Sequence, residues 1–235
     1  CRFLDTYANK INKIFINSIM RHSHIFIEKL FTLNKEITTL LHDFTLLFNN
    51  PQLYFHEIND ENIKYKLNIH KLNRIITQNI GNLYSFGRYL EGYNNIVVSE
   101  LPDYRKSDKK IVTNNAKTII GIIGNISDVK GYYVLQQIFL MVEKRTDIDI
   151  VVFGKAHIQR LTNQYTYNNI NEFNYLLEKH KPNVLLELSL WPETFSFTLS
   201  LAMITKLPII YHNKFLPNTV QRRLSLYQNA YAFDD

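Results

Sequence analysis

Short apolar runs alternate with segments of helical spacing through the second half of the chain. The apolar runs are rich in Ile, Val and Leu and predict buried strands. These strand segments are 119–124, 148–154, 184–189 and 207–212. The segments between them carry apolar residues at helical spacing and are 132–144, 170–180 and 195–205. Strands separated by helices of about 10–15 residues indicate βαβ units and a parallel sheet.

The first half of the chain repeats this alternation more weakly. Its expected strands are 14–17, 37–41, 75–78 and 96–99, and its expected helices are 24–33 and 83–90. A polar stretch with Lys106, Lys109 and Lys110 follows and has the composition of a linker. We therefore expect an α/β protein with two Rossmann-like domains, residues 1–106 and 107–235.

The amino-acid composition fits two folded domains and bears on the kinds of partner that we expect for the protein. Of the 235 residues 46% are hydrophobic, and no apolar run approaches the ~20 residues of a transmembrane segment. Cys1 is the single cysteine, which suits a reducing, cytoplasmic compartment. The net charge of +6 suits an anionic partner, and nucleotide phosphates, nucleic acid and acidic membranes would all satisfy it. The basic residues are not interleaved with exposed aromatic residues on a defined module, so we expect no nucleic acid partner.

The first loop with candidate chemistry follows the strand at 119–124. Gly124 allows close approach of a ligand to the backbone, and Asn125 comes directly after it. Lys130 and Gly131 stand where the next helix begins, and free N–H groups and a cation there favour an anion. A purely structural turn is the alternative, since the loop matches neither GxxxxGK[ST] nor GxGxxG.

The second loop follows the strand at 184–189 and is more specific. Pro192 stiffens its entry, and Thr194 or Ser196 can cap the helix expected from about Phe195. Glu193 can accept hydrogen bonds from sugar hydroxyls at the carboxyl edge of the sheet, where open α/β sheets bind ligands. A capped helix without a ligand is the alternative interpretation.

Other constellations carry less chemistry. Asp147 and Asp149 form a DxD, but they precede a buried strand instead of following one, which indicates a helix-to-strand turn. The eight histidines show no HExxH spacing, so we expect no metal. The absence of GxGxxG disfavours an epimerase or reductase.

Three segments together resemble the large retaining class of GT-B glycosyltransferases, which includes bacterial rhamnosyl- and mannosyltransferases and sucrose synthase. WPETFSFTLSLA resembles the acidic donor-site motif, GNISDVKG the Gly-rich and Lys loop, and LLHDF the histidine segment. The resemblance implies transfer of a sugar from a nucleotide-sugar donor to a glycan or other hydroxyl acceptor, with retention and without a metal. It begins within the acceptor-side domain, and the chain opens on Cys1, so we expect a fragment with a truncated N-terminal domain.

The resemblance also implies roles for individual residues. Lys130 would hold the donor diphosphate and Glu193 would contact the donor sugar. The amides of Thr194, Phe195 and Ser196 would bind phosphate, and His42 would lie near the reacting sugar.

Two positions depart from the family pattern. Leu201 stands where a second Glu usually holds the ribose, and Asn125 stands where an Arg commonly supports the diphosphate. A catalytically inactive module that binds nucleotide, glycan or protein is therefore the alternative function.

Overall fold

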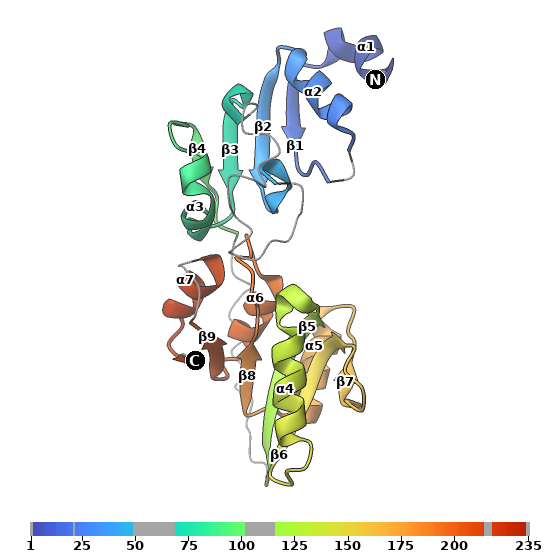
Figure 1. The fold of residues 1–235 in the computed structure, drawn as a ribbon, viewed down its shortest axis with the longest axis vertical. Coiled ribbons are helices and arrows are strands. Elements are labelled where there is room, and N and C mark those ends of the chain that lie inside the picture. The colour runs from blue at the N-terminus through green and yellow to red at the C-terminus, as the bar shows by residue number, and fades with distance from the viewer. Residues whose placement is uncertain (1, 21, 49–68, 102–115, 214–217, 234–235) are drawn as a thin grey trace. The chain divides into compact units, whose positions relative to one another are not determined.

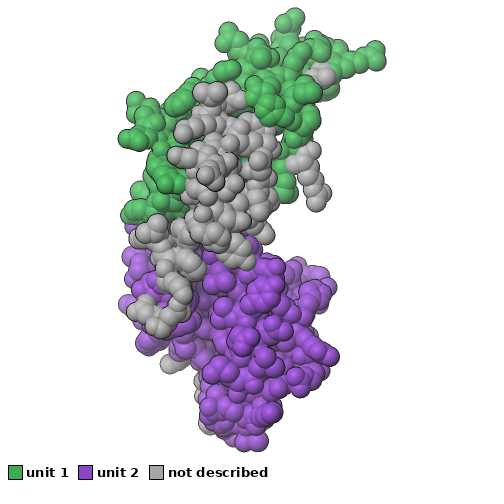
Figure 2. Space-filling view, viewed as in Figure 1, with its two compact units in different colours: residues 1–101, 192–195, 217–219 green, residues 102–191, 196–216, 220–235 purple. Residues whose placement is uncertain are grey.

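The structure is a computed structural model that describes residues 2–20, 22–48, 69–101, 116–213 and 218–233. It divides into two compact units, coloured separately in Figure 2. The first comprises residues 1–101, 192–195 and 217–219, and the second comprises residues 102–191, 196–216 and 220–235. The expected domain boundary at 106–107 and the basic cluster of Lys106, Lys109 and Lys110 lie outside the described residues.

A four-stranded parallel sheet forms the centre of the first unit, in the order β1-β2-β3-β4 (Figure 1). Its strands are β1 (Lys13–Ile16), β2 (Glu36–Leu41), β3 (Arg74–Thr77) and β4 (Ile96–Val98). Its helices are α1 (Arg2–Tyr7), α2 (His24–Thr32) and α3 (Gly81–Phe86), with 3-10 turns at Phe44–Leu46 and Gly87–Tyr89. Each predicted strand begins and ends within a residue of the observed one, whereas α1 was not predicted.

Aromatic rings fill the core of this unit. Phe44, Phe48 and Phe86 are fully buried, and the Phe44 and Phe86 ring centroids lie 4.7 Å apart. Helix α2 contributes Ile27, but Ile25 is 75% exposed. The two isoleucines differ because residues two apart point to different sides of a helix.

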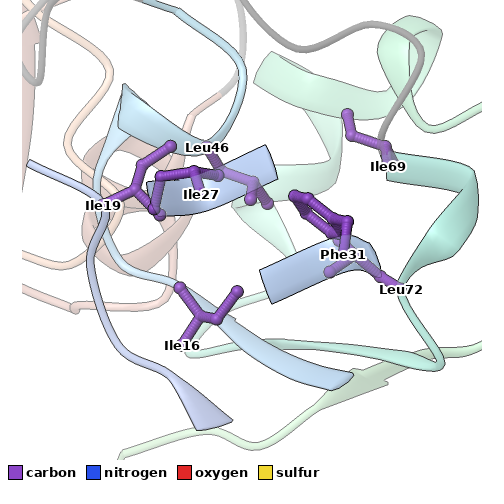
Figure 3. Close-up of a pocket in the computed structure, with 7 residues that line it drawn as sticks. All are labelled: Ile16, Ile19, Ile27, Phe31, Leu46, Ile69 and Leu72. Atoms are coloured by element: carbon purple, nitrogen blue, oxygen red, sulfur yellow. The ribbon is translucent and has the colours of Figure 1, made fainter. Parts of the chain in front are cut away.

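A small apolar cavity lies beside α2 (Figure 3). The volume of this cavity is about 10 Å³, which is about the space that one water molecule needs. The side chains lining it are those of Ile16, Ile19, Ile27, Phe31, Leu46, Ile69 and Leu72. They offer a water no hydrogen-bond partner, so this cavity is a packing feature of the core and not a ligand site.

A six-stranded parallel sheet forms the second unit, in the order β10-β9-β8-β5-β6-β7. Its strands are β5 (Thr118–Ile126), β6 (Ile148–Ala156), β7 (Gln164–Tyr165), β8 (Val184–Glu187), β9 (Ile209–His212) and β10 (Ala230–Phe233). Every pairing between them is parallel, which confirms the predicted βαβ arrangement. The outer strands β7 and β10 were not predicted.

Helices cover both faces of this sheet. They are α4 (Tyr132–Val142), α5 (Ile170–His180), α6 (Phe197–Ile204) and α7 (Thr219–Ser225). Alternate strand residues divide between the faces: Ile122 packs with Leu135 of α4, while Phe153 packs with Phe173 of α5. In Figure 1, helix α4 lies across one face of this sheet. In the described part of the chain, no helix combines the length and the apolar character needed to cross a membrane.

Candidate functional site

The strand order of the second sheet reverses between β5 and β8. The chain leaves β5 towards β6 on one side, whereas β8 and β9 lie on the other side. In open α/β sheets ligands bind at the carboxyl ends of the strands at such a switch point. The two loops singled out in the sequence are the ones that follow β5 and β8.

Direct contacts hold these two loops together. The Leu190 amide donates to the Val129 carbonyl at 2.8 Å. Gly131 has a φ of 81°, and a Cβ atom built on it would lie 2.4 Å from the Leu188 carbonyl oxygen. Only glycine fits here, because the backbone is left-handed and the neighbouring strand end leaves no room for a side chain. Lys130 is the half-buried last residue of the 3-10 turn that precedes Gly131.

Paired glycines bend β5 and β6 at the same level. Gly124 and Gly154 are register partners, with φ values of 115° and 145°. The next pair in register is Asn125 with Lys155, and both are exposed. The predicted site included Gly124 and Asn125 but missed Lys155, although the same pattern of glycine followed by a polar residue marks the end of both strands.

Helix α6 starts against the end of β5. Its N-cap is Ser196, whose hydroxyl accepts from the Leu199 amide at 3.3 Å. A Cβ atom built on Gly124 would lie 2.9 Å from the Thr198 methyl group, so the first turn of α6 packs on the bend in β5. The helix begins at Phe197, two residues later than expected, because Ser196 has extended backbone angles and caps the helix.

Glu193 and Thr194 belong to the first unit, at the carboxyl end of β2. The Thr194 hydroxyl donates to the carbonyl oxygen of His42, so these two predicted site residues are neighbours. Glu193 and Thr194 are 4% and 3% exposed. The His42 Nε2 atom lies 3.5 Å from a carboxylate oxygen of Asp43.

Asp43 fixes the local structure beside His42. One of its carboxylate oxygens accepts from the Thr45 amide at 2.8 Å, and the other accepts from the Ser18 hydroxyl at 3.1 Å. Within the described residues, the buried His42 Nδ1 atom has no hydrogen-bond partner. Lys130, predicted to hold the donor diphosphate, and Glu193, predicted to contact the donor sugar, lie in different units.

A buried polar network at the end of β3 was missed in the sequence. Asn82 donates to the Thr77 hydroxyl at 2.8 Å and accepts from the Thr219 hydroxyl at 2.8 Å. The side-chain oxygen of Asn79 accepts from the Gly81 amide at 2.7 Å. The signal was a Thr at a strand end followed by two Asn residues, and each residue alone is common in turns.

Leu201 is partly buried. It contacts the cluster of Val151, Phe153 and Phe173 between β6 and α5. Asp147 and Asp149 flank the start of β6, where they form ion pairs with Arg145 and Lys117. Across the described ranges, no group of three His, Cys, Asp or Glu residues is arranged to hold a metal ion.

Comparison with known proteins identifies solved structures that share this architecture. No protein-family model and no curated protein sequence matches the chain. Among solved structures, TarM aligns with a TM-score of 0.62 and 14% identity over 99% of this chain and 47% of its own. HepE (Alr3699) of Anabaena, in complex with UDP and glucose, aligns with a TM-score of 0.61 and 12% identity over 99% and 66%.

A glycosyltransferase from Rickettsia africae ESF-5 aligns with a TM-score of 0.59 and 14% identity over 99% of this chain and 64% of its own. The chain thus spans about half the length of TarM and nearly two thirds of the other two proteins. The chain therefore shares the GT-B fold of these glycosyltransferases, with two Rossmann-like parallel-sheet domains.

Proposed function

We propose that the protein is a glycosyltransferase that moves a sugar from a nucleotide-sugar donor to a glycan or another hydroxylated acceptor. Transfer would retain the anomeric configuration, need no protein-bound metal and take place in the cytoplasm. The observation that carries the proposal is the switch point between β5 and β8. There a lysine, two glycine-dependent close approaches and the start of α6 meet at one edge of the sheet.

This edge has the chemistry needed to hold a diphosphate. The first amides of α6 have no carbonyl partner within the helix and carry its partial positive charge. Lys130 adds a full positive charge from the neighbouring loop. When the bond between the sugar and the phosphate breaks, its electron pair stays with the nucleoside diphosphate. Cationic groups fixed in advance stabilise that leaving group.

We assign the donor sugar to Glu193 and His42. A buried carboxylate can accept hydrogen bonds from sugar hydroxyls, and Glu193 is 4% exposed. The Thr194 hydrogen bond to the His42 carbonyl joins the two segments that would contact this sugar. UDP is the first nucleotide to test, because the HepE complex contains UDP and glucose.

A second candidate is an inactive module that binds a nucleotide, a glycan or a protein. The packing of the Leu201 side chain against the cluster of Phe153 and Phe173 favours it, because a leucine at this position offers a ribose no hydrogen-bond acceptor. Donor turnover distinguishes the two candidates.

The test compares Lys130→Ala with Lys144→Ala, a matched substitution at an exposed lysine just beyond α4. Sugar release is measured from UDP-, GDP- and dTDP-sugars, and thermal unfolding is measured in parallel. We expect Lys130→Ala to lower kcat about a hundredfold or more with an unchanged melting temperature, and Lys144→Ala to change neither. Equal loss of activity and stability in Lys130→Ala would reject the assigned role, and no turnover by the unmodified protein would favour the inactive module.

A further inference from the structure

Helix α7 places a buried arginine against the first turn of α6. Arg223 is 6% exposed, whereas its neighbour Arg222 is exposed. Nη1 of Arg223 donates to the Ser196 carbonyl at 2.8 Å, and Nη2 donates to the Ser200 hydroxyl at 2.6 Å. The guanidinium therefore bonds to the N-cap residue of α6 and to a residue one turn further along.

These bonds fix the turn that lies on the bend in β5. The Ser196 hydroxyl already caps the Leu199 amide, and Thr198 contacts Gly124. Arg223 adds a planar, two-pronged attachment from a different helix, so the first turn of α6 is held from both sides. Amides fixed in this way keep their direction without reorganising when a ligand arrives.

We infer that Arg223 is a positioning residue for the donor diphosphate. Its two hydrogen bonds fix the first turn of α6, while the amides of that turn and Lys130 make the contacts. This inference rests on the proposed function and deepens it by naming the group that organises the diphosphate end of the site.

The experiment compares Arg223→Met and Arg223→Lys with the matched control Arg222→Met. Binding of UDP and of uridine is measured by calorimetry, and hydrogen exchange is followed at the amides of the first turn of α6. For Arg223→Met we expect about tenfold weaker UDP binding, or about 1.4 kcal/mol, with unchanged uridine binding and faster exchange. Arg223→Lys should recover part of the UDP affinity, because an ammonium group can still donate a hydrogen bond to α6 but lacks the planar fork that makes both.

Each outcome decides the inference. Equal loss of UDP and uridine affinity in Arg223→Met would show a general structural role and overturn it, as would the same loss in Arg222→Met. If Arg223→Met does not fold, Arg223→Lys carries the comparison, and unchanged UDP binding in that folded variant overturns the inference. Failure of the unmodified protein to bind UDP, GDP or inorganic pyrophosphate would instead reject the proposed function, and the inference with it.

Discussion

At the scale of single residues, Gly92 and Gly131 allow the cost of a strained backbone to be distinguished from the cost of a steric clash. Gly92 and Gly131 have nearly equal φ values of 77° and 81°. A Cβ atom on Gly92 would meet nothing within 4 Å, whereas one on Gly131 would lie 2.4 Å from a backbone carbonyl. Position 131 therefore requires glycine for two reasons, the left-handed backbone and the close packing of the neighbouring backbone.

We expect Gly92→Ala to lower the free energy of unfolding by about 1 kcal/mol, the usual cost of a left-handed alanine. Gly131→Ala should cost more than twice as much, because the Leu188 end of β8 must also move. Urea titration of both variants measures the difference. Equal losses would mean that the loop yields freely and that the two loops are not held together as described.

His180 is the residue for which pH dependence can be predicted. Its ring centroid lies 4.1 Å from that of Tyr165, and its Nε2 atom has no hydrogen-bond partner in the described part of the chain. Burial, and secondarily the charge of Lys179, lowers the pKa of His180 below its ordinary value. The unfolded chain therefore takes up a proton at a higher pH than the folded protein.

The free energy of unfolding should consequently fall as the pH drops below about 6.5. In His180→Phe this part of the pH dependence should disappear, and in the exposed control His70→Phe it should remain. Urea titrations between about pH 5 and pH 8 measure it. Identical slopes in His180→Phe and the unmodified protein would contradict the assignment.

At the scale of elements, two similar helix caps allow an effect on stability to be distinguished from an effect on function. Ser23 of α2 and Ser196 of α6 each accept a backbone N–H at 3.3 Å. Replacing either with Ala should cost about 1 kcal/mol of stability. Only Ser196→Ala should also reduce donor turnover, because its helix faces the proposed diphosphate. Stability measurements paired with turnover assays test this, and equal turnover in both variants would remove α6 from the site.

The sequence predicts those elements whose local signals agree. Helix α5 was predicted at Ile170–His180, where it lies, because Asn169 caps it and an apolar stripe at helical spacing faces the core. By contrast, β7 has only two residues, too few for a periodic pattern. Strand β10 has the sequence Ala-Tyr-Ala-Phe, which lacks the run of Ile, Val and Leu that marks the predicted strands. Helix α7, and Arg223 with it, was not predicted because seven residues with two adjacent arginines resemble an exposed turn.

At the scale of the whole molecule, the two-sheet α/β architecture followed from the alternation of elements, but the strand order did not. The sequence indicated that loops after β5 and β8 carry chemistry. It also led us to expect these loops at neighbouring strand ends, but it did not reveal that the strand order reverses between them, because that depends on long-range pairing. The assignment of Lys130 and Glu193 to different units is likewise a property of the tertiary contacts.

The central claim is that a nucleoside diphosphate binds at the carboxyl edge of β5 and β8. Hydrogen exchange with mass spectrometry, with and without saturating UDP, tests it most directly. We expect protection in the peptides that contain Gly124–Gly131 and Ser196–Ser200, and we expect Lys130→Ala to abolish it. Protection elsewhere with none in these two segments would contradict the claim.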